Sequence, residues 1–135
     1  MNTKNLEFLS KNLELPIKEF NLDLDEYRKK VVLDIVTDIQ NMLNPRQIIL
    51  TRNIYKYKKY HVKVLLNEPT NIGNTIFLRL FFGDDQKRIK FDLHRLASNV
   101  LNTFDFISDR KYNVNLKTGK KECLANYKSV PLSKR

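Results

Sequence analysis

Side chains that could perform catalysis or bind a metal ion are few in this chain. The two histidines, His61 and His94, have no acidic residue at a spacing that would hold a metal ion between them. Asp84, Asp85 and Asp92 could in principle bind a divalent cation, because hard cations prefer clustered oxygen ligands. Since Gly-Asp-Asp is also typical of a tight turn, we interpret Asp84 and Asp85 as turn residues.

Residues 118–121, Thr-Gly-Lys-Lys, contain the Gly-Lys pair of a phosphate-binding loop. They lack the earlier glycine and the following helix that such a loop requires, so we interpret them as a hairpin turn. The one cysteine, Cys123, cannot form an internal disulfide. Because no nucleophile, base and orienting group can be assembled, we predict a protein that is not an enzyme and has no cofactor and no bound metal.

The distribution of basic charge is a stronger indication of function than the side chains discussed so far. The formal net charge is +10, and two blocks of the chain hold the surplus. Residues 46–67 contain six basic side chains and no acidic one, and residues 110–135 contain eight basic side chains and one acidic one. A surface with this charge suits phosphate backbones, anionic lipid or an acidic protein partner.

Tyrosines are interleaved with the cations of the first block. Cations that follow a phosphate backbone and flat rings that stack on unpaired bases are the mixture expected of a single-strand binder. We therefore predict a non-enzymatic protein that binds single-stranded DNA or RNA, with the lysines of the second block on the same positive face. The predicted interface residues are Arg52, Tyr55, Lys56, Tyr57, Lys58, Lys59, Tyr60, Lys63, Lys117, Lys120 and Lys121.

An alternative partner for this face is an acidic protein. The chain would then be a phage or mobile-element adaptor or inhibitor that binds a host protein, and the sequence does not decide between a monomer and a homodimer. No apolar run approaches the roughly 20 residues needed to cross a membrane, and the first residues lack the apolar stretch of a signal peptide. We expect no membrane partner and a location in the cytoplasm or another reducing intracellular compartment.

Helical periodicity predicts two main helices. One covers residues 24–43, with Asp23 as its N-cap, and the other covers residues 93–108. Residues 1–20 form an N-terminal extension or a short helix, and residues 131–135 form a basic tail.

Alternation at period two predicts the strands. In the segment from Ile76 to Phe82, Phe77 and Phe81 flank Arg79 on one face, and we expect a helix to cover these two rings. The predicted strands are residues 47–53, 60–66, 75–82 and 87–92, followed by a C-terminal pair at 112–116 and 122–130.

These elements predict one α+β domain over residues 1–135, in the order α-α-β-β-β-β-α-β-β. Its antiparallel sheet has four to six strands in a meander, and both main helices pack on one face. The layout of residues 47–108, four strands and then a helix, resembles the unit found in a family of transcriptional coactivators and in whirly proteins. That resemblance is one of element order and implies a curved sheet that binds single-stranded DNA.

Overall fold

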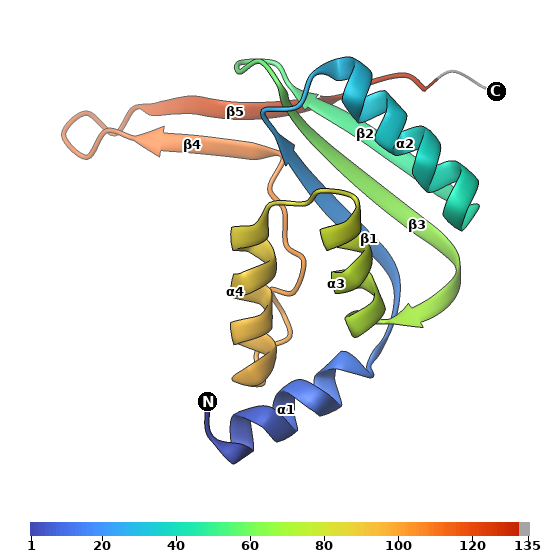
Figure 1. Cartoon of the computed structure of the whole chain (residues 1–135). Coiled ribbons are helices and arrows are strands. Elements are labelled where there is room, and N and C mark those ends of the chain that lie inside the picture. The colour runs from blue at the N-terminus through green and yellow to red at the C-terminus, as the bar shows by residue number, and fades with distance from the viewer. Residues whose placement is uncertain (133–135) are drawn as a thin grey trace.

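The computed structural model describes residues 1–132, so the predicted basic tail at 131–135 lies mostly outside the described residues. Within them the chain forms four helices and five strands (Figure 1). In chain order these are α1 (Thr3–Leu13), β1 (Pro16–Asp25), α2 (Lys29–Leu43), β2 (Gln47–Asn53), β3 (Lys59–Asn71), α3 (Ile72–Phe81), α4 (Gln86–Ala97), β4 (Arg110–Val114) and β5 (Lys121–Ser129).

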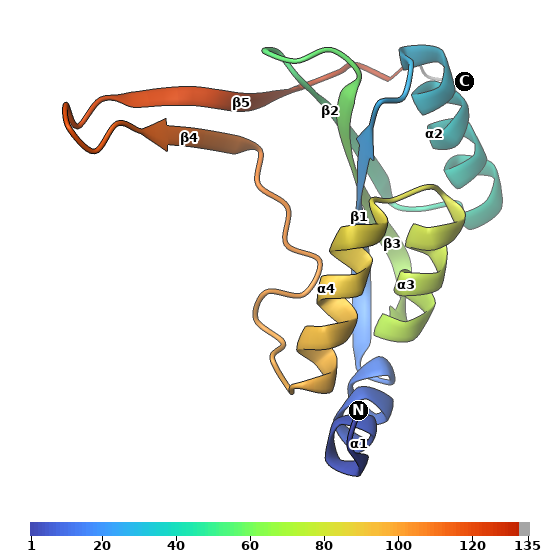
Figure 2. The same cartoon turned by 60° about the vertical axis from the view of Figure 1, so that its left-hand side comes forward.

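Across residues 1–132 the strands form one antiparallel sheet in the order β1-β3-β2-β5-β4. The predicted α+β fold with an antiparallel sheet is therefore confirmed. The β4–β5 hairpin joins β2 through the short register from Thr51 opposite Ser129 to Asn53 opposite Tyr127. Its far end projects well away from the helices (Figures 1 and 2), and the predicted turn at Thr118-Gly119 is confirmed, with Gly119 at φ +70°.

Helix α2 covers one face of β1, β3 and β2. Phe20, Leu22 and Leu24 alternate along β1 and point to this face, where they form the main core. The same core contains Val62 and Val64 of β3, together with the apolar row of α2. Figure 2 shows α2 lying along one side of β1 and β3, which is the position predicted for the first main helix.

The predicted start of that helix was wrong. Residues 16–25 form a strand, and α2 begins only at Lys29. Asp23 and Asp25 resemble helix-capping residues in type, but the alternation of Phe20, Leu22 and Leu24 with polar side chains fits a half-buried strand, and the core favours it. The helix ends at Leu43 as predicted, with Asn44 in the left-handed conformation at φ 44°.

The predicted hairpin at residues 75–92 is also wrong. The two segments are helices α3 and α4, so the four-strand meander and the resemblance built on it do not hold. In α3 the buried positions are Ile72, Thr75, Ile76 and Arg79, which is helical spacing. The period-two pattern placed Arg79 on a face with Phe77, whereas the helix buries the arginine and leaves Phe77 exposed.

The second predicted helix, residues 93–108, occupies a different range. Helix α4 starts at Gln86 and stops at Ala97, and Asn99, just beyond the C-cap Ser98, has a positive φ of 59°. Asp105 has a φ of 55°, so the predicted range up to residue 108 is not one continuous helix. Leu101, which the predicted stripe placed in the core, is 41% exposed.

A second core forms between the helices rather than on the sheet face covered by α2. Ile72 and Ile76 of α3 meet Ile89 and Leu96 of α4 there, and leucines of α1 pack around them. Among residues 1–132, each helix is too short or too polar to span a bilayer.

Candidate functional site

The sheet face opposite α2 is polar, because it is built by the residues that alternate with the core positions. Strand β1 places Asn21, Asp23 and Asp25 there, and β3 adds His61 directly opposite Asp23. Within residues 1–132, α4 and the segment 104–111 rise beside this face and leave a cleft of about 580 Å³.

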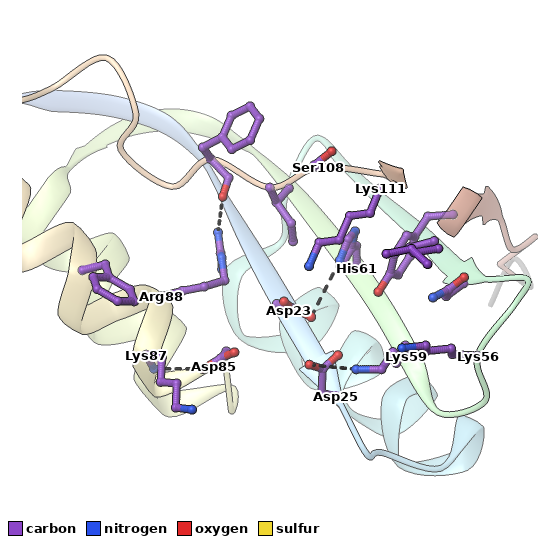
Figure 3. A pocket seen from close by; sticks show the side chains of 17 residues that line it. Asp23, Asp25, Lys56, Lys59, His61, Asp85, Lys87, Arg88, Ser108 and Lys111 are labelled. Carbon is purple, nitrogen blue, oxygen red and sulfur yellow. Dashed lines mark hydrogen bonds and ion pairs between the residues drawn. The ribbon is translucent and has the colours of Figure 1, made fainter. Parts of the chain in front are cut away.

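Three kinds of side chain are prominent in the lining of the cleft, which Figure 3 shows as sticks. Carboxylates and an imidazole lie on its floor, cations surround them, and aromatic rings stand among the cations. The carboxylates are Asp23, Asp25 and Asp85, and the imidazole is His61. The cations are Lys56, Lys59, Lys87, Arg88 and Lys111, and the rings are Phe91, Phe106 and Tyr127.

A buried ionic network holds the elements around the cleft together. The side chain of Arg79 is 0% exposed, and its Nε donates to Asp84 Oδ2 at 2.7 Å while Nη1 donates to Asp92 Oδ2 at 2.8 Å. Arg88 donates to Asp84 Oδ1 at 2.7 Å and to Asp105 Oδ1 at 2.7 Å. Burial by itself would lower the pKa of Arg88, but the carboxylates of Asp84 and Asp105 raise that pKa by more. Its net shift is upward, so the guanidinium stays charged.

The same carboxylates fix the position of β1. Asp84 Oδ1 accepts the backbone N–H of Asp23 at 2.7 Å, and Asp105 Oδ2 accepts the backbone N–H of Asn21 at 2.7 Å. Because Arg88 binds both carboxylates, α4, β1 and the segment that contains Asp105 are tied at one point. This arrangement sets where the side chain of Asp23 enters the cleft.

The floor concentrates negative charge. One oxygen from each of Asp23, Asp25 and Asp85 lies within 4.8 Å of the others. Burial raises the pKa of Asp23 to about 7, and the neighbouring Asp25 adds to the rise. Lys59 partly compensates this charge, since its Nζ lies 3.3 Å from Oδ2 of Asp25.

His61 is held on two sides. Its side chain is 9% exposed, and its ring stacks on Tyr127 with centroids 3.5 Å apart and planes 9° from parallel. Its Nδ1 hydrogen-bonds Asp109 Oδ1 at 3.0 Å, and its Nε2 lies 3.7 Å from Oδ1 of Asp23. Burial lowers the pKa of His61, so the neutral imidazole is favoured.

Of the predicted interface residues in the first basic block, the structure brings only Lys56 and Lys59 to the cleft. Lys63 lies on the same face of β3, where it is 3.8 Å from Glu19. Arg52 shares its side of β2 with the core residue Leu50, so it faces away from the cleft.

None of the three predicted tyrosines lines the cleft. Tyr60 is 5% exposed and belongs to the main core, so it is not available to stack on a base. Tyr55 and Tyr57 are exposed beside Lys58 in the segment between β2 and β3, outside the set of residues that line the cleft.

Lys117, Lys120 and Lys121 lie around the tip of the β4–β5 hairpin. Figures 1 and 2 show this tip at the free end of the hairpin, away from the β2–β3 turn, so the two groups of predicted residues lie at separate places on the molecule. The hairpin reaches the cleft near its base, through Lys111, Leu124, Ala125 and Tyr127.

Sequence reasoning missed the acidic floor and most of the cations around it. The signal was present in residues 20–25, where polar and apolar residues alternate, but Asp23 was interpreted as a helix N-cap. The positions of Asp85, Lys87 and Arg88 depended on recognising α4. No known protein family, curated protein or solved structure matches the chain, so its function is argued from the cleft itself.

Proposed function

We propose that this protein binds single-stranded nucleic acid in the cleft. The observation that carries the proposal is the combination of five cations with aromatic rings around one cavity of about 580 Å³. That volume lies within the range of about 300 to 1,000 Å³ typical of pockets that bind small ligands. A nucleotide unit of a longer strand is a ligand of this class.

The cations and the rings have different tasks in this proposal. Lys56, Lys87 and Lys111 contact phosphate oxygens, and each contact releases counterions from the strand. Phe91 and Phe106 are exposed at the cleft, where their faces can stack on bases with little sequence preference. A single strand fits this arrangement better than a duplex, because only unpaired bases present their flat faces to a protein.

Fluorescence anisotropy with single- and double-stranded DNA and RNA, at two salt concentrations, tests the proposal. We expect the tightest binding to single strands and a steep loss of affinity with salt. Lys56→Gln and Lys111→Gln should each lower the slope of log affinity against log salt by about 0.7 to 0.9. Arg52→Gln is the matched control, because it removes the same charge from the opposite side of the sheet.

Two results would count against binding in the cleft. One is the absence of salt-dependent binding to any nucleic acid at tens of micromolar. The other is an equal effect of Arg52→Gln and Lys56→Gln, which would indicate a general charge effect.

A second candidate is an adaptor or inhibitor, of phage or mobile-element origin, that binds an acidic protein. Helix α3 favours a protein contact, because Phe77, Leu80 and Phe81 are exposed at positions three and four apart on one side of it. If no nucleic acid binds, the cations around the cleft become the contact surface for the acidic partner.

A further inference from the structure

The outer part of the β4–β5 hairpin is an arm that no other element of residues 1–132 covers. Strand β4 pairs with β5 alone, and residues 109–122 are exposed without a break. Figures 1 and 2 show the arm extending away from the helices and from the rest of the sheet. A two-stranded hairpin is only marginally stable by itself, so an exposed arm of this kind fits a segment that acts through a partner.

Basic charge indicates the chemistry of that partner. Residues 110–128 contain six basic side chains and one acidic side chain, Glu122. The ion pairs of the described residues 1–132 involve other cations, so Lys117, Lys120 and Lys121 have no carboxylate partner there. Lysines on an edge strand often serve only to prevent aggregation. Lys117 and Lys120 lie in the turn between the strands, where that explanation does not apply.

The turn holds these lysines in a defined backbone conformation. Oδ1 of Asn115 accepts the N–H groups of Lys117 and Thr118, at 2.9 and 3.3 Å. The N–H of Gly119 donates to the carbonyl of Asn115 at 2.8 Å, and the N–H of Asn115 donates to the carbonyl of Lys120 at 2.9 Å. The tip therefore presents its charges without a large cost of ordering the backbone on binding.

A leucine lies at the same tip. Leu116 is 96% exposed, and an apolar side chain in this position gains from any contact that removes it from water. Cations around one apolar side chain match a groove of nucleic acid, whose rim is phosphate and whose floor is made of base edges.

We propose that the β4–β5 hairpin binds double-stranded DNA in its major groove, as a second interface beside the cleft. That groove is about 12 Å wide and about 8.5 Å deep, and it admits a two-stranded β-ribbon. The five residues of β4 span about 17 Å at about 3.4 Å each, so the arm is long enough to bring its tip to the groove floor. Lys117, Lys120 and Lys121 contact phosphates, and Leu116 reaches base edges, among which the methyl group of thymine is apolar.

This interface does not depend on the proposed binding of single strands. The hairpin joins the lining of the cleft near its base, whereas the lysines of the tip lie at its free end. A DNA that contains both forms would occupy both places, so the protein would bind the boundary between duplex and single strand. That last step rests on the proposed function, and the binding of duplex DNA by the arm does not.

Anisotropy titrations of the full chain with blunt duplex DNA, at several salt concentrations, test the arm. Lys117→Gln combined with Lys120→Gln should lower the slope of log affinity against log salt by about 2, since each phosphate contact contributes about 1. Lys29→Gln combined with Lys30→Gln is the matched control, because it removes the same charge from exposed positions of α2 and should leave the slope unaltered. Thermal melts of both variants should match the parent, since all four lysines are exposed.

Leu116→Ser separates a groove contact from a general charge effect. It should weaken binding of duplex DNA about tenfold with no change in the salt slope, because burial of one leucine side chain is worth roughly that factor. Duplex RNA is the comparison ligand, since its major groove is too deep and narrow for side chains to read. The parent chain should bind it more weakly than duplex DNA, and Leu116→Ser should leave that binding unaltered.

Three results would overturn the arm as a duplex-binding element. The first is equal binding of duplex DNA by the parent and by the Lys117→Gln, Lys120→Gln variant, and the second is an equal loss in that variant and in the control. The third is binding of polyglutamate that the arm variant loses and that duplex DNA does not displace, which would make the partner an acidic protein.

Single-stranded DNA measured in parallel keeps the two proposals distinguishable. A parent chain that binds single strands and no duplex retains the cleft and rejects the arm. A parent chain that binds duplex DNA through the arm and binds no single strand rejects the proposed function and retains the arm.

Discussion

The face of the sheet that packs on α2 and the face that lines the cleft are built by alternate residues of the same strands. In β1, Phe20, Leu22 and Leu24 point to α2, while Asp23 and Asp25 point to the cleft. On the apolar face, the side chains of α2 and of the strands fill the core. The polar face is completed by partners from distant segments, because each buried charge requires an opposite charge or a hydrogen bond.

This difference separates what stabilises each face. The α2 face depends on packing that many apolar side chains could supply. The cleft face depends on a few ionic contacts with fixed geometry, above all those of Arg79 and Arg88 with Asp84 and Asp105. Substitutions on the two faces should therefore differ in size and in the property that they change.

Removing a buried charge should have the largest effect. Arg79→Met removes the guanidinium that the buried carboxylates of Asp84 and Asp92 share, and should lower the free energy of unfolding by about 3 to 5 kcal/mol. Urea unfolding measures the change. Arg95→Met is the control, since Arg95 is largely exposed and lies 3.6 Å from Asp92, and it should cost about 1 kcal/mol or less. Equal effects of the two substitutions would show that the network does not hold the cleft together.

A cavity in the apolar face should have the second-largest effect on stability. Leu22→Ala removes a fully buried side chain from the main core and should cost about 2 to 5 kcal/mol, because the surrounding core relaxes only partly. Leu101→Ala is the comparison and should cost about 1 kcal/mol or less, since this leucine is half-exposed. A larger loss for Leu101 in thermal melts would restore the core predicted from the sequence.

Removing an aromatic ring from the cleft should weaken nucleic-acid binding and leave the stability of the fold unaltered. Phe106→Ala should weaken binding of single strands by about 1 to 3 kcal/mol with almost no change in the salt slope, because stacking releases no counterions. Phe106 is 70% exposed and lines the cleft, whereas Tyr57 is 81% exposed outside it, so Tyr57→Ala is the control. Anisotropy titrations that show the reverse order would place the strand on the β2–β3 turn.

The smallest effect concerns a hydroxyl on the polar face. Oγ1 of Thr51 is buried and has no hydrogen-bond partner in the part of the chain that the structure describes. Thr51→Val keeps the shape and removes this atom, so it should raise the free energy of unfolding by about 0.5 to 1 kcal/mol. Thr37→Val should bring no gain, because Oγ1 of Thr37 already donates to Leu33. A loss of stability in Thr51→Val would indicate an ordered water at that position.

The sequence predicted elements well where one periodicity was clear. Strand β2 has the predicted bounds, 47–53, and α2 ends where predicted, because apolar alternation and an asparagine before proline each have one structural meaning. The segment from Ile76 to Phe82 carries two periodicities at once. The helical periodicity of this segment places Arg79 on the buried side. A buried arginine is expected only if acidic partners are known to surround it, and here these are Asp84, Asp92 and Asp105.

The candidate site was less predictable for a related reason. Its residues come from β1, β3, α4 and β5, and spacing along the chain does not show that Asp23 and His61 are opposite each other in neighbouring strands. The basic block at 46–67 did lead to Lys56 and Lys59, because charge excess is a local property of sequence. Which side of a strand a residue occupies is not local, so the sequence did not show that Arg52 faces away from the cleft or that Tyr60 belongs to the main core.

The carboxylates on the outer side of β1 have a consequence for association between chains. An outer strand normally offers free N–H groups as a template on which another chain can add a strand. In β1 the N–H groups of Asn21 and Asp23 are already bound by Asp105 and Asp84. An incoming strand would have to displace these two buried carboxylates and break their ion pairs with Arg79 and Arg88, so β1 is protected against edge-to-edge aggregation.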